Sequence, residues 1–427
     1  MRGMLAVAAL FGLSGAAFAD TLRVPQDHET IQAAADAASA GDTILVSRGI
    51  YDERVVVSGK DRLRFIGRAA VWDGFAGSKG RCLDATGNGI VVQGFRFRNG
   101  GVRLTGDDAS VTRCTIRSAN TTGLAIGGSG ATVAGCTIVG CYVGIDISGA
   151  RATITKNRVA NMDDRGIELD GPDGEITRNL VKVIEDGQGI DVSGDRCVIS
   201  RNTIVNSDSS NIEADGDDLV IEKNRCVGNG SYGIDVTGDG FRIVGNRISL
   251  AIDDTDGMDL DANSSAGGGL VEKNVVEDVV EDGIYYSGNN VTFRNNKVIG
   301  QGSEGDNAFY ISGSGNTLEG CQAIDCEGDG FNVSGDGNTL THCRAVSCLE
   351  DGFDIESGGG NQIIDCTAID CDAEGVDNEG QGTVLRGGTF TGNRIDIAND
   401  VSGGATFATF APGRYVTGGT DTQPEID

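Results

Sequence analysis

The residues with the clearest chemical potential occupy one repeating acidic position. A short phrase of glycine, apolar, polar and apolar residues recurs along the chain, and its third residue is usually Asp or Glu. The third residues are Asp146, Glu168, Asp191, Glu213, Asp235, Asp259, Tyr285, Tyr310, Asn332, Asp354 and Asp377. The apolar residues on either side should point inward, so the third residue should face solvent. If successive phrases lie side by side, these residues form one acidic column.

Stacked carboxylates can do several kinds of chemistry. At the spacing of neighbouring strands, about 5 Å, they repel one another unless something intervenes. Some would then have raised pKa values, or a cation such as Ca²⁺ would bind between them. Retaining glycosidases use a similar carboxylate separation, although the fold alone would supply it here. The alternative is a solvated acidic face that only keeps the protein soluble.

The best single neighbourhood lies where the repeat lengthens, between Gly233 and Ala308. Insertions on a regular solenoid usually lie on its binding face. The predicted catalytic residues are Asp256, Asp259, Glu281 and Asp282. The segment AIDDTDGMDLDAN predicts a calcium site made of Asp253, Asp254, Asp256, Asp259 and Asp261. It lacks the full spacing and the closing Glu of an EF-hand loop.

Substrate contacts are expected beside these acids. Tyrosines cluster here in a chain with only 5% aromatic residues, and we expect them to face outward. An exposed tyrosine ring can stack on a sugar while carboxylates bind its hydroxyls. The predicted substrate-binding residues are Asp191, Glu213, Asp235, Tyr285, Tyr286 and Tyr310.

Short strands must position these residues. A second phrase, of the type ITKNRV, runs in phase with the first, and both recur about every 22 residues. Apolar and polar residues alternate, and no helical period runs through the repeats. The pattern predicts an all-β solenoid, a parallel β-helix, over residues 20–404. A leucine-rich repeat is the alternative, but this chain lacks its Leu-rich phrase.

The second phrase carries a column of small polar residues at its fourth position. Its members are Cys114, Cys136, Asn157, Asn179, Asn202, Asn224, Asn246, Asn274, Asn296, Cys321, Cys343 and Cys366. We expect the asparagines to adopt left-handed geometry at a turn and to bond the neighbouring coil. Cysteines of one coil should lie about 16 Å apart, too far for a shared metal or a disulfide. Between coils, one or two bridges could form among mostly buried thiols; Cys197 and Cys226 fit the core.

The two ends of the chain differ from the repeats. Residues 1–19 resemble a signal peptide, with an apolar run ending in the Ala17-Phe18-Ala19 cleavage pattern, which predicts a secreted or periplasmic protein. An N-terminal membrane anchor is the alternative. Thr30 to Ser39 predicts a short helix that caps the first coil. Residues 405–427 lose the repeat and should form a C-terminal cap or tail.

Charge limits the possible partners. The net charge is −29 and the pI about 4.3, so nucleic acid and anionic membranes should be repelled. An acidic polysaccharide would need a bridging divalent cation at the acidic face. After the leader, no apolar run is long enough for membrane insertion. We expect a monomer. With only two histidines in the chain, a nucleophile–His–acid triad is not expected.

These repeats resemble the pectin-lyase-like superfamily of right-handed parallel β-helices with PbH1 repeats. The opening stretch Glu29 to Val57 is similar to the start of members with the carbohydrate-binding and sugar-hydrolase repeat and of NosD-like periplasmic proteins. The resemblance implies a polysaccharide groove along the acidic column. It also implies Ca²⁺ with a Lys or Arg base in lyases, for which Arg165 and Lys182 are nearest. The His-Gly motif of polygalacturonases and the DPH motif of alginate epimerases are absent.

The sequence therefore predicts an exported β-helix that interacts with polysaccharide along an acidic, calcium-binding face, as a polysaccharide lyase, hydrolase or epimerase. The alternative is a non-catalytic β-helix: a NosD-like periplasmic accessory protein, a surface binding module or an adhesin. Nothing in the sequence names the sugar.

Overall fold

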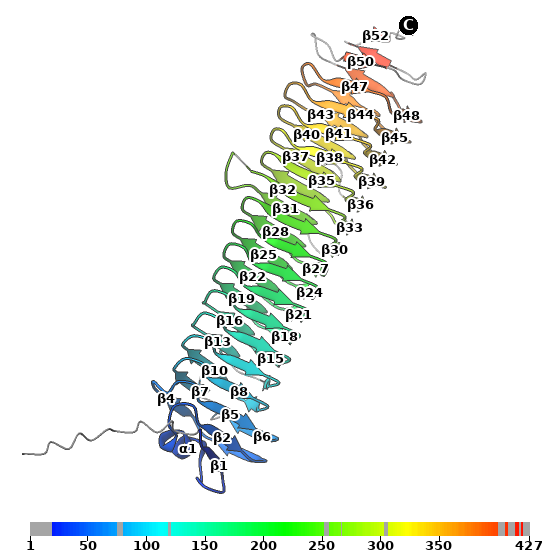
Figure 1. Ribbon diagram of the computed structural model, residues 1–427. Coiled ribbons are helices and arrows are strands. Elements are labelled where there is room, and N and C mark those ends of the chain that lie inside the picture. The colour runs from blue at the N-terminus through cyan, green and yellow to red at the C-terminus, as the bar shows by residue number, and fades with distance from the viewer. Residues whose placement is uncertain are drawn as a thin grey trace, which may run out of the picture.

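The chain winds into a rod of stacked coils. A computed structural model describes residues 19–74, 80–117, 121–251, 256–265, 267–302, 306–399, 406–408, 415–417 and 420–421. Among these residues, three sheets run along the rod, and successive coils pair in parallel (Figure 1). Nearly all of the predicted signal peptide, much of the predicted C-terminal cap, and Asp253 and Asp254 lie outside the described residues.

The first sheet opens each coil. Its strands are β1 (Thr21–Val24), β2 (Thr43–Val46), β5 (Arg64–Gly67), β8 (Val91–Gln93), β11 (Ser110–Thr112), β14 (Thr132–Ala134), β17 (Thr153–Thr155), β20 (Glu175–Thr177), β23 (Val198–Ser200), β26 (Val220–Glu222), β29 (Phe241–Val244), β32 (Gly269–Glu272), β35 (Val291–Arg294), β38 (Thr317–Glu319), β41 (Thr339–Thr341), β44 (Gln362–Ile364), β47 (Val384–Arg386) and β50 (Thr406–Ala408).

The second sheet follows after a tight turn. Its strands are β3 (Gly49–Asp52), β6 (Ala70–Asp73), β9 (Arg96–Arg98), β12 (Thr115–Arg117), β15 (Thr137–Cys141), β18 (Arg158–Met162), β21 (Leu180–Ile184), β24 (Thr203–Ser207), β27 (Arg225–Asn229), β30 (Arg247–Ala251), β33 (Val275–Glu277), β36 (Lys297–Ile299), β39 (Gln322–Ile324), β42 (Arg344–Val346), β45 (Thr367–Ile369) and β48 (Thr389–Thr391).

The third sheet contains the acidic column. Its strands are β4 (Val55–Val57), β7 (Gly80–Thr86), β10 (Gly100–Thr105), β13 (Leu124–Ile126), β16 (Ile145–Ile147), β19 (Ile167–Asp170), β22 (Ile190–Ser193), β25 (Ile212–Asp215), β28 (Ile234–Thr237), β31 (Met258–Asp261), β34 (Ile284–Ser287), β37 (Phe309–Ser312), β40 (Phe331–Ser334), β43 (Phe353–Ile355), β46 (Asp377–Asn378), β49 (Ile397–Asn399), β51 (Tyr415–Thr417) and β52 (Thr420–Asp421).

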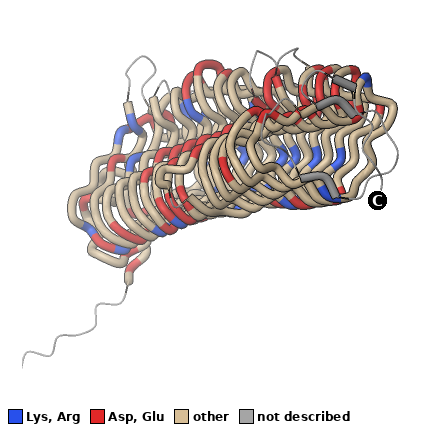
Figure 2. Tube along the Cα trace, turned by 90° about the horizontal axis from the view of Figure 1, so that it is seen from above, with Lys and Arg blue, Asp and Glu red and all other residues tan. Residues whose placement is uncertain are grey.

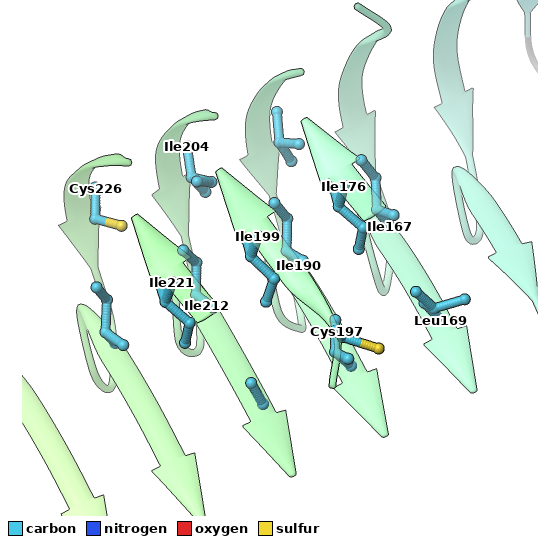
Figure 3. Close-up of a cluster of buried hydrophobic side chains, with 14 of the residues drawn as sticks. Ile167, Leu169, Ile176, Ile190, Cys197, Ile199, Ile204, Ile212, Ile221 and Cys226 are labelled. Atoms are coloured by element: carbon cyan, nitrogen blue, oxygen red, sulfur yellow. The ribbon is translucent and has the colours of Figure 1, made fainter. Parts of the chain in front are cut away.

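The core consists of ladders of inward side chains. Ile167, Ile190 and Ile212 occupy paired positions on β19, β22 and β25, and all are fully buried (Figure 3). Further along, the rings of Phe309 and Phe331 stack with centroids 4.7 Å apart, and Phe353 continues the stack at 5.0 Å. Each such side chain contributes about 1.5–3 kcal/mol through burial. The predicted period of two is thereby confirmed.

Buried asparagines tie each coil to the next at the turn between the first and second sheets. The Oδ1 of Asn179 accepts the Asn157 amide at 2.9 Å, and the Nδ2 of Asn179 donates to the Ile154 carbonyl at 2.9 Å. The predicted bond to the neighbouring coil is confirmed. The left-handed residue is the one before the asparagine, such as Arg178 with φ 57°, so that part of the prediction is wrong. The asparagine itself turns inward because its amide is needed to pair buried backbone groups.

Cysteines replace asparagine at both ends of this column. All twelve cysteines are buried free thiols, so the inter-coil bridges expected from sequence do not form. The Sγ atoms of Cys343 and Cys366 instead contact backbone carbonyl oxygens, those of Leu318 and Leu340, at 3.5 and 3.6 Å. Cys197 and Cys226 are core residues, as predicted.

One short helix precedes the regular coils. Helix α1 (Ile31–Ala37) begins after Thr30, whose hydroxyl accepts the Ala33 amide at 3.0 Å. It contacts β1, β2 and β4. Its role as a cap for the first coil stays a prediction. Among the described residues, no helix is long and apolar enough to cross a bilayer.

Candidate functional site

The acidic column exists as predicted on the outer face of the third sheet. Asp146 pairs with Glu168, Glu168 with Asp191, and Asp191 with Glu213 on successive strands. The ladder continues through Asp235 and Asp259, then Tyr285, Tyr310, Asn332, Asp354 and Asp377. None of these side chains lies in the core, and rows of acidic residues run along the rod (Figure 2). Neighbouring backbone positions of the column are therefore about one strand spacing, 4.8 Å, apart.

The middle of the column holds carboxyl groups that resist ionisation. Burial, followed by repulsion from Asp259 and Glu213, raises the pKa of Asp235 to about 7. Burial and the charge of Asp261 raise the pKa of Asp259 to about 6, although a hydrogen bond from Tyr232 opposes the rise. These groups are half-buried, and water is less able to stabilise their charge. Both carboxyls therefore hold their protons to a higher pH than an exposed carboxyl does.

A second column, immediately before the repeated glycine, supplies partners to the first. The Arg165 Nε lies 2.8 Å from Asp191, and Gln188 Nε2 donates to Glu213 at 2.8 Å. Both contacts run diagonally to the next coil, as does the bond from Tyr232 to Asp259. Arg165, the base suggested by the family resemblance, is thus an ion-paired guanidinium. Sequence reasoning missed Gln188 and Tyr232, although each lies directly before the repeated glycine of its own coil.

Acids in the second column also accept backbone amides. Asp256 Oδ1 accepts the amide of Asp282 at 2.8 Å, and Asp282 in turn accepts the amide of Asn307 at 2.5 Å. Burial is the main reason that the pKa of Asp256 rises to about 8 and that of Asp282 to about 6. The charges of Asp259 and Glu281 also raise the pKa of Asp256, so the four predicted catalytic residues do lie in one neighbourhood. Their catalytic roles stay a prediction.

Two of the three predicted tyrosines form a platform. The rings of Tyr285 and Tyr310 stack in parallel, with centroids 5.2 Å apart and planes within 2°. They follow Asp259 directly in the outward column, and both are partly exposed. Tyr286 is fully buried, so its predicted outward position is wrong. It lies between Leu260 and Ile311 at an inward position, and its hydroxyl donates to the Asn289 carbonyl at 3.2 Å.

The predicted calcium site is only partly described. Asp256, Asp259 and Asp261 lie in the structure, whereas Asp253 and Asp254 fall outside the described residues. Among the described residues, no group of three or more His, Cys, Asp or Glu side chains is arranged to hold a metal ion. One oxygen of Asp256 is already bonded to an amide. The calcium site stays a prediction.

Sequence and structure comparisons give a family and several similar folds. A family model described as a right handed beta helix region matches residues 100–249, 187–310 and 252–395. A search of curated proteins finds no match.

Similar solved structures include a GH87 α-1,3-glucanase catalytic unit from Streptomyces thermodiastaticus, with 14% identity and a TM-score of 0.29 over 91% of this chain. The chain spans 65% of that unit's length. A PL6 family polysaccharide lyase from Pseudopedobacter saltans has 14% identity and a TM-score of 0.45, covering 76% of this chain and 84% of its own. An Azotobacter vinelandii mannuronan C-5 epimerase module has 15% identity and a TM-score of 0.32, covering 89% and 94%.

Proposed function

The chain belongs to the right-handed β-helix family, and from this premise we propose that it binds an uncharged polysaccharide along the third sheet, between Glu213 and Asn332. The observation that carries the proposal is the parallel pair Tyr285–Tyr310, set directly after Asp235 and Asp259 in one outward row. A tyrosine ring offers an apolar face to a pyranose ring, and its hydroxyl remains free for hydrogen bonds.

The carboxyl groups suit hydroxyl-rich ligands better than charged ones. A protonated carboxyl both donates and accepts, whereas an ionised one only accepts. With pKa values of about 7 and 6, Asp235 and Asp259 offer both forms at neutral or slightly acidic pH. A uronate would meet further repulsion here, because Glu213, Asp215 and Asp261 surround the pair.

Binding is tested by titrating neutral β- and α-glucan oligosaccharides into the purified protein by calorimetry. The double variant Tyr285→Ala/Tyr310→Ala should weaken binding at least tenfold, since stacking of a sugar on each tyrosine ring is worth about 1 kcal/mol or more. Tyr142→Ala is the matched control, because Tyr142 is 52% exposed outside the column. Equal binding by the double variant and the control would refute the site. Arms with Ca²⁺ and with EDTA test the predicted calcium site separately.

Retaining hydrolysis is the second candidate, and the Asp235–Asp259 pair favours it. Paired positions on adjacent strands place the two carboxyls near the separation of about 5 Å used by retaining glycosidases. Asp235, with the higher pKa, would protonate the leaving oxygen as Asp259 attacks the anomeric carbon, so that the glycosidic bond breaks and a glycosyl ester forms on Asp259. Water, deprotonated by Asp235, would then hydrolyse that ester and restore both carboxyls. New reducing ends that disappear in Asp259→Asn, but persist in Asp173→Asn on a distant turn, would support it. Unsaturated products would instead indicate a lyase.

The proposal places the protein outside the cytoplasm, where the signal peptide predicted at residues 1–19 would deliver it. A non-catalytic binding or adhesive rod remains the outcome if neutral glycans bind without turnover. Localisation is tested by fractionating cells that express the full chain and by N-terminal sequencing of the exported form. Cleavage after Ala19 is expected, and an uncleaved, membrane-bound form would contradict it.

A further inference from the structure

A row of basic residues lies on a different edge of the rod, at the turn between the first and second sheets. Successive coils place Lys156, Arg178, Arg201 and Lys223 at the residue before the buried asparagine. Their backbone amides each bond to the next coil at that turn, so the four residues are in register. The strand spacing puts them about 4.8 Å apart.

The backbone at this position disfavours such side chains. All four residues have a left-handed conformation, with φ between 55° and 57°. Other coils use glycine there, as at Gly135 with φ 64° and Gly245 with φ 66°. A left-handed residue other than glycine costs about 1 kcal/mol. The left-handed conformation recurs at this turn in other coils, as at Arg113, Asn295 and Asp365, so it belongs to the turn itself. What distinguishes these four consecutive coils is that each carries a cation there.

The cations are free to bind a ligand. Lys156, Arg178 and Arg201 are exposed, and in the described part of the chain no ion pair joins any of them to a carboxylate. They border a hollow of about 260 Å³ on the outer face of β17 and β20. Hydroxyls line it as well: Thr177 donates to Thr155 at 3.1 Å. One acid, Glu175, lies on its wall.

We propose that this hollow and its cation row bind an acidic polysaccharide, with its carboxylates or sulfates spaced along the rod axis. This second site lies apart from the tyrosine face and takes the opposite class of glycan. An acidic sugar chain presents both charged groups and hydroxyls, and the hollow offers cations beside the hydroxyls of Thr153, Thr155 and Thr177. Double-stranded DNA carries about one charge per 1.7 Å. A row of single cations about 4.8 Å apart would therefore neutralise only about one in three of those phosphates.

The test measures binding of a labelled oligogalacturonate, by fluorescence anisotropy in EDTA and low salt. In the triple variant Lys156→Gly/Arg178→Gly/Arg201→Gly, binding should weaken about threefold per cation, or about 30-fold in all. Glycine relieves the backbone strain, so the variant should fold. The matched control is Arg62→Gly/Arg151→Gly/Arg196→Gly, which removes the same charge from left-handed residues at another turn. It should change binding less than about twofold.

Two gain-of-binding variants keep the proposal falsifiable. Glu175→Gln should strengthen binding about threefold by removing the acid from the hollow. Gly135→Lys should extend the row toward Arg113, because a Cβ at Gly135 meets no atom within 4 Å. The proposal is overturned if the wild type does not bind, if the control triple weakens binding as much as the test triple, or if a neutral maltooligosaccharide or single-stranded DNA binds equally well. None of these variants touches the tyrosine face, so either proposal can fail alone.

Discussion

Replacing Asp354 with asparagine should stabilise the rod at alkaline pH. Burial and repulsion by Asp329 and Asp377 raise the pKa of Asp354 to about 8. Its folded-state pKa lies above its unfolded value of about 3.9, so the folded state holds the proton more tightly. The carboxyl therefore costs nothing below pH 4, and its unfavourable effect grows between pH 4 and 8 as the unfolded chain ionises first.

The magnitude follows from the size of the pKa change. Ionising the group at pH 8 would cost about 5 kcal/mol without screening, at 1.36 kcal/mol per pH unit. Asp354 is only half-buried, and solvent screening lowers the figure to about 1–2 kcal/mol. Asparagine has the same shape and can still accept the bond that Asn332 donates to Asp354 at 2.9 Å. We therefore expect Asp354→Asn to gain about 1–2 kcal/mol at pH 8 and nothing at pH 4.

Urea unfolding at both pH values measures the difference. A long repeat array need not unfold in one step, so hydrogen exchange at β40, β43 and β46 should report the local gain. Asp173→Asn is the control. Arg196 lowers the pKa of Asp173, so removing the Asp173 charge should give no gain in stability. An equal effect at pH 4 and pH 8, or a loss at pH 8, would refute the electrostatic account.

Three further predictions concern the core. Asn202→Ala should lower the free energy of unfolding in urea by about 2–4 kcal/mol, because the buried Asn179 amide and Ile176 carbonyl lose their hydrogen-bond partner. A loss below about 0.5 kcal/mol would mean that the asparagine ladder is not needed for stability. Phe331→Ala should lower the free energy of unfolding by about 3–5 kcal/mol and Phe331→Leu by under about 1.5 kcal/mol, since the ring packs between two others in a stack. Similar losses in the two variants would show that packing volume is not the cause. A thiol reagent should label no cysteine in the native protein and all twelve after unfolding, and fewer after unfolding would reveal a disulfide.

The repeat allowed the columns to be predicted from sequence, because residues one coil apart must become neighbours once the strands pair. Asp146, Glu168 and Asp191 align as the phrase spacing requires. The expectation that Tyr286 faces outward is wrong because the two-residue period that points Tyr285 outward points Tyr286 inward. The sequence also does not show the sign of the φ angle. The left-handed conformation of the residues before the asparagines, such as Lys156, is therefore seen only in the structure.

The acids before the repeated glycine were harder to assign. Asp256 and Asp282 resemble their neighbours in the outward column, yet their carboxylates bond amides of the next coil. Variable loop lengths between Gly233 and Ala308 hide that register from any reading of the phrase alone. Their distinct role depends on which amide each carboxylate reaches, and only the folded coil determines that.

Radical footprinting of the tyrosines, with and without a neutral oligosaccharide, tests the glycan-binding face most directly. Protection of Tyr285 and Tyr310 together, with Tyr142 labelled equally in both samples, is the predicted result. Unchanged labelling of the stacked pair under saturating sugar would contradict the proposed function.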